Sequence, residues 1–316
     1  MSAAVLPEVF NKSIDTLLEI EQLTASRAVV PIKKPFAKVL ALLVALWPGD
    51  DATDIEKRHA VSLLNTEAFM NTLPEVERAI LKGATEALSQ GIDAGMTQVG
   101  LKGMSFKREL PIHLDMVVRA TQRVMRKRVD TGTALLQQAT TLLEAQAALA
   151  VANPAPAISA QARWLTNRAS NEGLLMVAEA SQDVVAVWVA ERDGCVHCLA
   201  YQGHKRGRNG YPAGLTFGKK ALHTKPVPMP PLHPNCRCTQ LLLDVTIAQP
   251  VIEGLLREAQ RSILRGWSVE SESQNVRIDA ARRLLAKNSR MPKSVQAYAR
   301  SAIKSGKFKR GRVFPS

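Results

Sequence analysis

All four cysteines of this 316-residue chain fall in one short stretch, as two close pairs. The first pair lies in Asp193-Gly194-Cys195-Val196-His197-Cys198, and the second lies in His233-Pro234-Asn235-Cys236-Arg237-Cys238. The two thiolates of a Cys-x-x-Cys pair can reach one metal ion, and a structural zinc takes four such ligands in a closed tetrahedral shell. No other feature constrains the fold as strongly, because a shared metal would tie together two segments that are distant along the chain.

The loop between the two pairs contains no Asp or Glu, and glycine and proline interrupt it repeatedly. Because the loop has no regular hydrophobic period, we expect a cross-link to replace the core that it does not build. Two disulfides or four unrelated buried thiols are the alternatives to a metal. No secretory signal opens the chain, so the pattern favours a metal over disulfides. The loop carries six basic residues: Lys205, Arg206, Arg208, Lys219, Lys220 and Lys225.

The spacing leaves the fourth ligand open. Cys236 and Cys238 share one face if their segment is a strand, so both thiolates could bind the ion. Alternatively, His233 and Cys236 form the second pair around a Pro-Asn turn, and Cys238 packs nearby. The predicted zinc ligands are therefore Cys195, Cys198, Cys236 and Cys238, with His233 as the alternative fourth ligand.

The same residues resemble a known family. Their order looks like that of the Mu F-like head-morphogenesis proteins of tailed phages. It comprises a strand ending in Val187-Trp188-Val189-Ala190, then Asp193-x-Cys195-x-x-Cys198, a turn at Gly203, a variable loop and His-Pro-Asn-Cys-Arg-Cys. The resemblance covers roughly residues 160 to 245. Gln202 departs from the family pattern, which tends to have an acidic residue before this glycine.

The resemblance implies a minor head protein that acts near the portal during capsid assembly. It implies the portal and major capsid proteins as partners, and a place in the virion, inside the capsid near the portal vertex. The protein would be made in the host cytoplasm, and it could be packaged with DNA. Modules of this kind also precede toxin domains, but the residues after this one contain no evident catalytic constellation.

Composition predicts a mainly α-helical chain. Apolar residues make up 46% of the sequence but aromatic residues only 4%, so we expect cores of Ala, Leu and Val, which suit packed helices. The most apolar run, Phe36 to Trp47, is shorter than the about 20 residues that a membrane span needs. Two β-branched or apolar runs, Val184 to Ala190 and Thr239 to Val245, predict strands. A small zinc-stabilised α+β module within a helical chain is therefore expected.

Proline and glycine residues that interrupt the helical and strand patterns divide the chain into three predicted regions. Residues 1–157 form a helical N-terminal region suited to docking on other head proteins, residues 158–247 form the zinc module, and residues 248–316 form a helical, basic C-terminal region. Within the first region we expect Pro31 and Pro35 to break a helix. Its glycines between Gly91 and Ser105 predict a flexible loop, and a long, mainly helical stretch should follow from Pro111 to Ala150.

The formal net charge of +14 predicts an acidic partner. No acidic residue follows Asp279, so the C-terminal cations have no counter-charge and indicate non-specific binding to the phosphates of double-stranded DNA. We expect this tail to be partly mobile. The predicted DNA-binding residues are Arg282, Arg283, Lys287, Arg290, Lys293, Arg300, Lys304, Lys307, Lys309, Arg310 and Arg312.

The sequence predicts no enzyme. It contains no phosphate-binding Gly-x-x-x-x-Gly-Lys-Ser/Thr loop, no dinucleotide fingerprint and no His-Glu-x-x-His helix. A deaminase would need a His-x-Glu motif before its Cys pair, and a thioredoxin-like pair would need a βαβ setting. The alternative to a head protein is a zinc-stabilised, non-specific nucleic-acid-binding protein with no role in the capsid.

Overall fold

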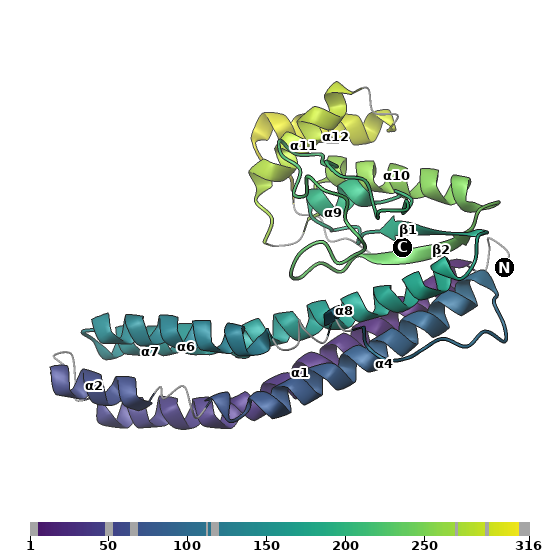
Figure 1. The fold of residues 1–316 in the computed structure, drawn as a ribbon. Helices are drawn as coiled ribbons and strands as arrows, with labels where there is room; N and C mark the ends of the chain where they lie inside the picture. Colours follow the sequence, from purple (N-terminus) through teal and green to yellow (C-terminus); the bar gives the residue numbers. More distant parts are fainter. Residues whose placement is uncertain are drawn as a thin grey trace. The chain divides into compact units, whose positions relative to one another are not determined.

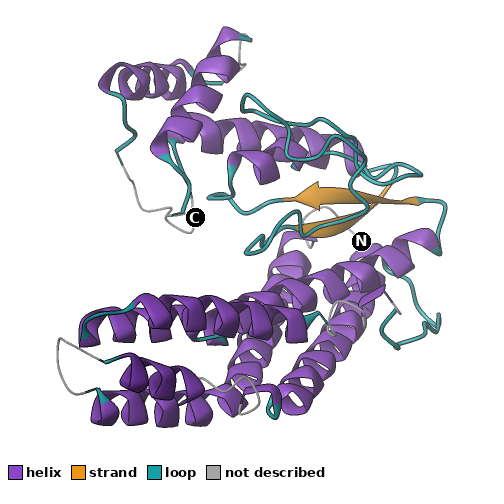
Figure 2. Cartoon of the chain, turned by 60° about the vertical axis from the view of Figure 1, so that its left-hand side comes forward, coloured by secondary structure: helices purple, strands orange, loops and turns teal. Residues whose placement is uncertain are grey.

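The chain is mainly α-helical with a small two-stranded sheet, as the composition predicts (Figures 1 and 2). The computed structural model describes residues 6–47, 53–63, 69–111, 113–114, 120–268, 271–287 and 291–309. Within these ranges, no helix is both long enough and apolar enough to cross a membrane.

The chain divides into two compact units. Unit 1 comprises residues 1–14, 89–107 and 170–316, and unit 2 comprises residues 15–88 and 108–169. The three regions expected from the sequence do not coincide with these units, because three long helices contribute residues to both. The three-region division therefore stays a prediction about which parts fold independently.

Unit 2 is built from packed helices and from parts of helices that continue into unit 1. Small residues allow the helices to approach closely. A Cβ added at Gly132 in α6 would lie 2.3 Å from the Cβ of Ala152 in α7, and one added at Gly83 in α4 would overlap Thr24 of α1. Among the described residues, the helices with defined bounds are α1 (Leu6–Leu46), α2 (Asp54–Leu63), α4 (Leu73–Val99), α6 (Thr121–Gln138), α7 (Leu142–Ala152) and α8 (Ala155–Glu179).

The predicted helix break at Pro31 and Pro35 is wrong. Both prolines lie inside α1, which runs without interruption from Leu6 to Leu46. A proline removes one backbone donor and strains the preceding turn, but burial of apolar side chains outweighs that local cost here. The buried side chains near the two prolines include Ile32, Val39 and Leu43.

The predicted flexible loop from Gly91 to Ser105 is also wrong over its first half, because α4 continues to Val99. Within unit 1, a Cβ added at Gly91 would lie 2.0 Å from the carbonyl oxygen of Ser170 in α8. This glycine therefore serves close packing between helices and not flexibility. Farther on, the predicted helical stretch from Pro111 to Ala150 forms two shorter helices, α6 and α7.

The sheet of unit 1 matches its two predicted strands. Strand β1 (Val184–Val189) pairs antiparallel with β2 (Thr239–Asp244), in a register that sets Val184 opposite Asp244 and Val189 opposite Thr239. The segment from Gly203 to Arg206 lies along the other edge of β1, where the N–H of Trp188 donates to the carbonyl of His204 at 3.0 Å. The Cys-rich loop is thus attached to the sheet by backbone hydrogen bonds.

Four helices complete the described part of unit 1 after the strand β1. The short α9 (Val196–Tyr201) follows β1, and α10 (Ala248–Arg265), α11 (Gln274–Ala286) and α12 (Lys293–Ser305) follow β2. The last three share one hydrophobic cluster with the Cys-rich module, centred on Trp188, Tyr201 and Tyr211. The basic C-terminal helices are therefore packed onto the module, and the expected mobility of the tail is wrong for residues 282–287 and 291–309.

Two glycine substitutions test the packing account. Gly91→Ala should lower the free energy of unfolding by roughly 2 kcal/mol or more, because its methyl group would meet the backbone of Ser170. Gly254→Ala, in α10, should raise the free energy of unfolding by about 0.5–1 kcal/mol. An added Cβ would meet no neighbouring atom within 4 Å, and alanine favours a helix. Denaturant titration monitored by circular dichroism checks both, and equal effects would contradict the account.

Candidate metal centre

The first cysteine pair is positioned by the end of β1 and the start of α9. A turn closed by the N–H of Gly194 and the carbonyl of Glu191 follows the strand, and Cys195 then caps the N-terminus of α9. The Cys195 sulfur accepts a hydrogen bond from the N–H of Cys198 at 3.5 Å. One helical turn thereby brings both sulfurs to the same side of α9.

The second group is positioned by a tight turn just before β2. The N–H of Cys236 donates to the carbonyl of His233 at 3.0 Å, and Asn235 adopts a left-handed conformation with φ of 63°. Asparagine tolerates this conformation better than most residues, which explains its place in the His-Pro-Asn-Cys sequence. Cys238 is buried directly before the first residue of β2.

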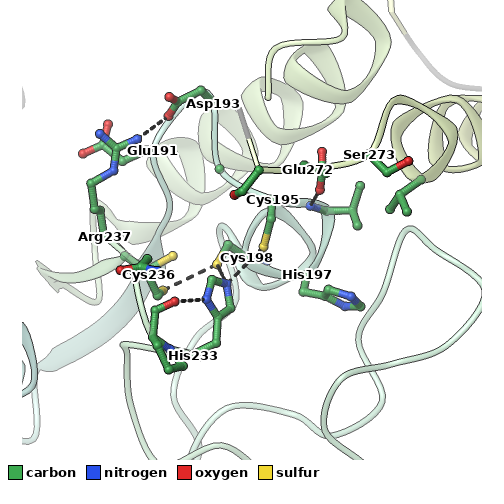
Figure 3. A pocket seen from close by; sticks show the side chains of 17 residues that line it. Glu191, Asp193, Cys195, His197, Cys198, His233, Cys236, Arg237, Glu272 and Ser273 are labelled. Carbon is green, nitrogen blue, oxygen red and sulfur yellow. Dashed lines mark hydrogen bonds and ion pairs between the residues drawn. The ribbon is translucent and has the colours of Figure 1, made fainter. Parts of the chain in front are cut away.

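The two groups meet in one cluster of five possible metal ligands (Figure 3). The Nε2 atom of His233 lies 3.2 Å from the sulfurs of both Cys195 and Cys198, and the sulfurs of Cys198 and Cys236 are 3.5 Å apart. Two sets of three could hold a metal ion: Cys195, Cys198 and His233, and Cys198, Cys236 and Cys238. Cys198 belongs to both. Both candidates for the fourth ligand are thus near the ion's expected position.

The hydrogen bond made by the other imidazole nitrogen suits His233 for metal binding. Its Nδ1 lies 2.7 Å from the carbonyl oxygen of Pro234, which can only accept, so Nδ1 carries the proton. The hydrogen bond to Cys195 raises the pKa of His233 to about 9, so without a metal Nε2 also carries a proton, and a bound cation would have to displace it. A backbone carbonyl that fixes the tautomer in this way is the usual support for a histidine ligand.

The cysteines are not disulfide-bonded, and they share protons. All four are free. A hydrogen bond from Cys198 lowers the pKa of Cys195 to about 4 and that of Cys236 to about 2. The same bonds raise the pKa of Cys198, and burial raises that of Cys238. Thiolates and thiols thus alternate within a buried cluster, which is the setting in which a bound cation can replace the shared protons.

A cavity of about 710 Å³ lies over the cluster, and charged residues form part of its wall. The guanidinium of Arg237 donates to the carboxylate of Asp193 at 2.8 Å, which ties the second Cys segment to the first. Burial raises the pKa of the nearby Glu191. His197 also lines this cavity, but Figure 3 shows its ring pointing away from the cysteines.

A buried ion pair that the sequence did not reveal fastens α11 to the metal-binding turn. Glu272 accepts from the N–H of Val196 at 2.8 Å and pairs with Arg277 at 2.6 Å. Arg277 has no exposed surface, and it also donates to the carbonyl of Gly194 at 2.7 Å. Burial lowers its pKa. Both residues lie far from the cysteines in sequence, so local patterns gave no signal for them.

The predicted DNA-binding residues are spread over α11, α12 and the chain that follows them. Arg290, Arg310 and Arg312 lie outside the described residues. The others are all exposed: Arg282, Arg283, Lys287, Lys293, Arg300, Lys304, Lys307 and Lys309.

Comparison with protein-family models, with curated proteins and with solved structures finds no match. The chemistry of the site therefore rests on the residues themselves.

The buried ion pair can be tested against an exposed one. Arg277→Ala should lower the free energy of unfolding by about 3–5 kcal/mol, because Glu272 would keep a buried charge without its partner. Arg282→Ala breaks an ion pair with Asp279 in the same helix, but its side chain is 59% exposed, so the loss should stay below about 1 kcal/mol. Urea unfolding of the two variants measures the difference. Similar losses would contradict the structural role of Arg277.

Proposed function

We propose that the cluster holds one structural zinc ion through Cys195, Cys198, Cys236 and His233, with Cys238 beside the site. The distances of 3.2 Å from His233 to Cys195 and Cys198, and of 3.5 Å from Cys198 to Cys236, are close to the edges of a zinc tetrahedron. Cys236 groups with Cys198 and Cys238, so it would move toward Cys195 and His233 when the ion binds. Zinc bonds of about 2.3 Å to sulfur and about 2.0 Å to nitrogen give edges of roughly 3.5–3.8 Å. Four protein ligands leave no open position on the ion, so its role would be structural.

The zinc would add to the stabilisation that the loop gains by packing Tyr211, Val227 and Leu232 into the hydrophobic cluster. The stretch between Cys198 and Cys236 contains no helix or extended strand after α9, only isolated bridges such as Tyr211 to Val227. Joining its two ends removes conformational freedom from the unfolded chain. The free energy of metal binding then contributes directly to folding.

Metal content tests the site. The purified protein should contain about one zinc per chain by elemental analysis, and Cys195→Ser or Cys236→Ser should abolish binding and unfold the module. His233→Ala should lose most of the zinc, whereas Cys238→Ala should keep it. The converse pattern would assign the fourth position to Cys238. An absence of zinc and other transition metals would contradict a metal centre.

We further propose that the chain is a structural minor head protein of a tailed phage that acts near the portal in capsid assembly. The observation that supports this role is the Cys-rich motif on which the family resemblance rests. Its residues make specific structural contacts in this chain. Asn235 makes the turn, the cysteines and His233 converge, and Arg237 binds Asp193. Under this proposal, the portal and major capsid proteins are its partners, it has no enzymatic activity, and it lies inside the capsid near the portal vertex.

The helical unit 2 suits a docking role. It exposes large apolar side chains that a solvated bundle does not need, among them Ile55 at 78% and Leu143 at 76%. Exposed apolar residues of this size are typical anchors of protein interfaces. We therefore assign the contact with other head proteins to the part of unit 2 that lies within the N-terminal region 1–157.

Co-assembly tests the head role. When the protein is co-expressed with the portal and major capsid proteins of the same phage, it should copurify with assembled heads. The double variant Ile55→Glu/Leu143→Glu should reduce its incorporation about tenfold or more, because each charge would disrupt an apolar contact. Val245→Glu is the matched control, since Val245 is an exposed apolar residue of unit 1. Heads that never contain the wild-type protein would overturn the proposal.

The second candidate is a zinc-stabilised nucleic-acid-binding protein without a capsid role. The exposed cations of α11 and α12 favour it, since their phosphate contacts would not require other head proteins. Co-assembly separates the two candidates, because DNA binding without incorporation into heads is the result that the second one predicts.

A further inference from the structure

A basic surface in unit 1 is formed by two segments that are far apart in the sequence. Lys219 and Lys220 come from the loop of the Cys-rich module, and Arg282 and Arg283 come from α11. We name these four residues the loop–α11 surface. From the sequence, nucleic-acid binding was assigned to the C-terminal residues alone.

One acidic side chain links the two segments. The carboxylate of Asp279 lies 3.5 Å from Nζ of Lys219 and 2.8 Å from NH1 of Arg282. Both cations therefore lie within one ion-pair distance of the same group, and they are close to each other. Asp279 is the last acidic residue of the chain, so the cations from Lys287 onward have no acidic neighbour nearby along the chain.

The loop is anchored against α11. Leu215 and Phe217 pack on the hydrophobic cluster that contains Ile278, Ala281 and Leu284 of this helix. Beyond Phe217, Gly218 donates its N–H to the hydroxyl of Thr216 at 2.8 Å, which turns the chain toward Lys219. The cations of the loop are thus presented at a defined place beside α11, so less conformational entropy is lost when they bind a ligand.

The charges exceed what Asp279 can neutralise. Lys219 and Arg282 share one carboxylate, and Lys220 and Arg283, their neighbours in sequence, are exposed. The side chain of Lys219 remains 73% exposed despite its ion pair. A surplus of this kind on an ordered surface attracts an anionic partner.

The surroundings favour phosphate over an acidic protein. In the loop and from 271 to 287 and from 291 to 309, the substantially exposed large apolar side chains are Leu222 at 45% and Val276 at 40%, one on each segment. Protein interfaces take most of their binding energy from buried aromatic and aliphatic anchors, whereas the phosphate backbone of DNA is bound by exposed cations alone.

We propose that the loop–α11 surface binds the phosphate backbone of duplex DNA without sequence preference, and that Asp279 weakens this binding. The proposal deepens the phosphate binding described for the second candidate function, and it rests on that candidate's nucleic-acid contacts. Lys219 and Lys220 then contribute phosphate contacts together with α11, and binding depends on the packing of the loop as well as on the C-terminal cations. Asp279 orients Lys219 and Arg282 but repels the phosphates that they contact.

Two charge variants of the full-length protein test the role of Asp279. Asp279→Asn removes the repelling charge and should bind a 30-base-pair duplex roughly fivefold more tightly at low salt. One further phosphate contact would steepen the plot of log affinity against log salt by about 0.9. Glu86→Gln is the matched control, because it removes one acid that pairs with Lys82 at 4.0 Å in unit 2. It should change neither the affinity nor the slope.

A third variant tests the loop. Lys219→Ala/Lys220→Ala should weaken binding about tenfold or more. It should also reduce the slope of log affinity against log salt by the amount that corresponds to about two phosphate contacts. Unchanged zinc content and circular dichroism ensure that the variants are folded. Equal effects of Asp279→Asn and Glu86→Gln, or an undiminished affinity of the lysine variant, would overturn the proposal. Because only purified protein and duplex are used, its failure leaves the role in head assembly untouched.

Discussion

Convergence of four thiols and one imidazole in a largely buried cluster is the constraint on which unit 1 depends. Sulfurs this close cannot all ionise without a cation, and they are not joined by disulfides. Hydrogen bonds among them lower the pKa of Cys195 and Cys236 and raise that of Cys198. A metal ion resolves this conflict, because it stabilises every thiolate at once. The packing of the loop and of the last three helices then builds on the same cluster.

Much of this site could be predicted from the sequence, because its chemistry is local. The spacing of the cysteines and the His233-to-Cys238 motif pointed to residues that the structure brings together in groups that could hold a metal ion. Strands β1 and β2 follow from their apolar runs. The buried ion pair of Glu272 and Arg277 could not be predicted, since neither residue belongs to a motif. The backbone groups that they bind, in the turn before α9, lie some 80 positions away. Gln202 likewise looked like a departure from a family pattern. Its amide donates to the carbonyl of Leu255 at 3.0 Å, which an ionised acid could not do.

The errors outside the site share one physical cause. Proline and glycine were taken as signals of breaks and flexibility, but tertiary packing outweighs such local preferences. Pro31 and Pro35 stay in α1 because the helix buries an apolar face around them. Gly91 stays in α4 because the helix approaches Ser170 of α8 too closely for a side chain. A single sequence does not reveal which helices meet, so it could not distinguish these roles.

Hydrogen exchange with and without a strong chelator tests the central claim most directly. If a metal ion holds the Cys-rich loop in place, its removal should accelerate exchange by about a hundredfold or more from Cys195 to Cys238, and also in α11, which Glu272 and Arg277 join to the turn. Residues 121–152 of unit 2 should exchange at unchanged rates. Equal protection of the loop in both conditions would contradict the account, because the fold of the module would then not depend on a metal.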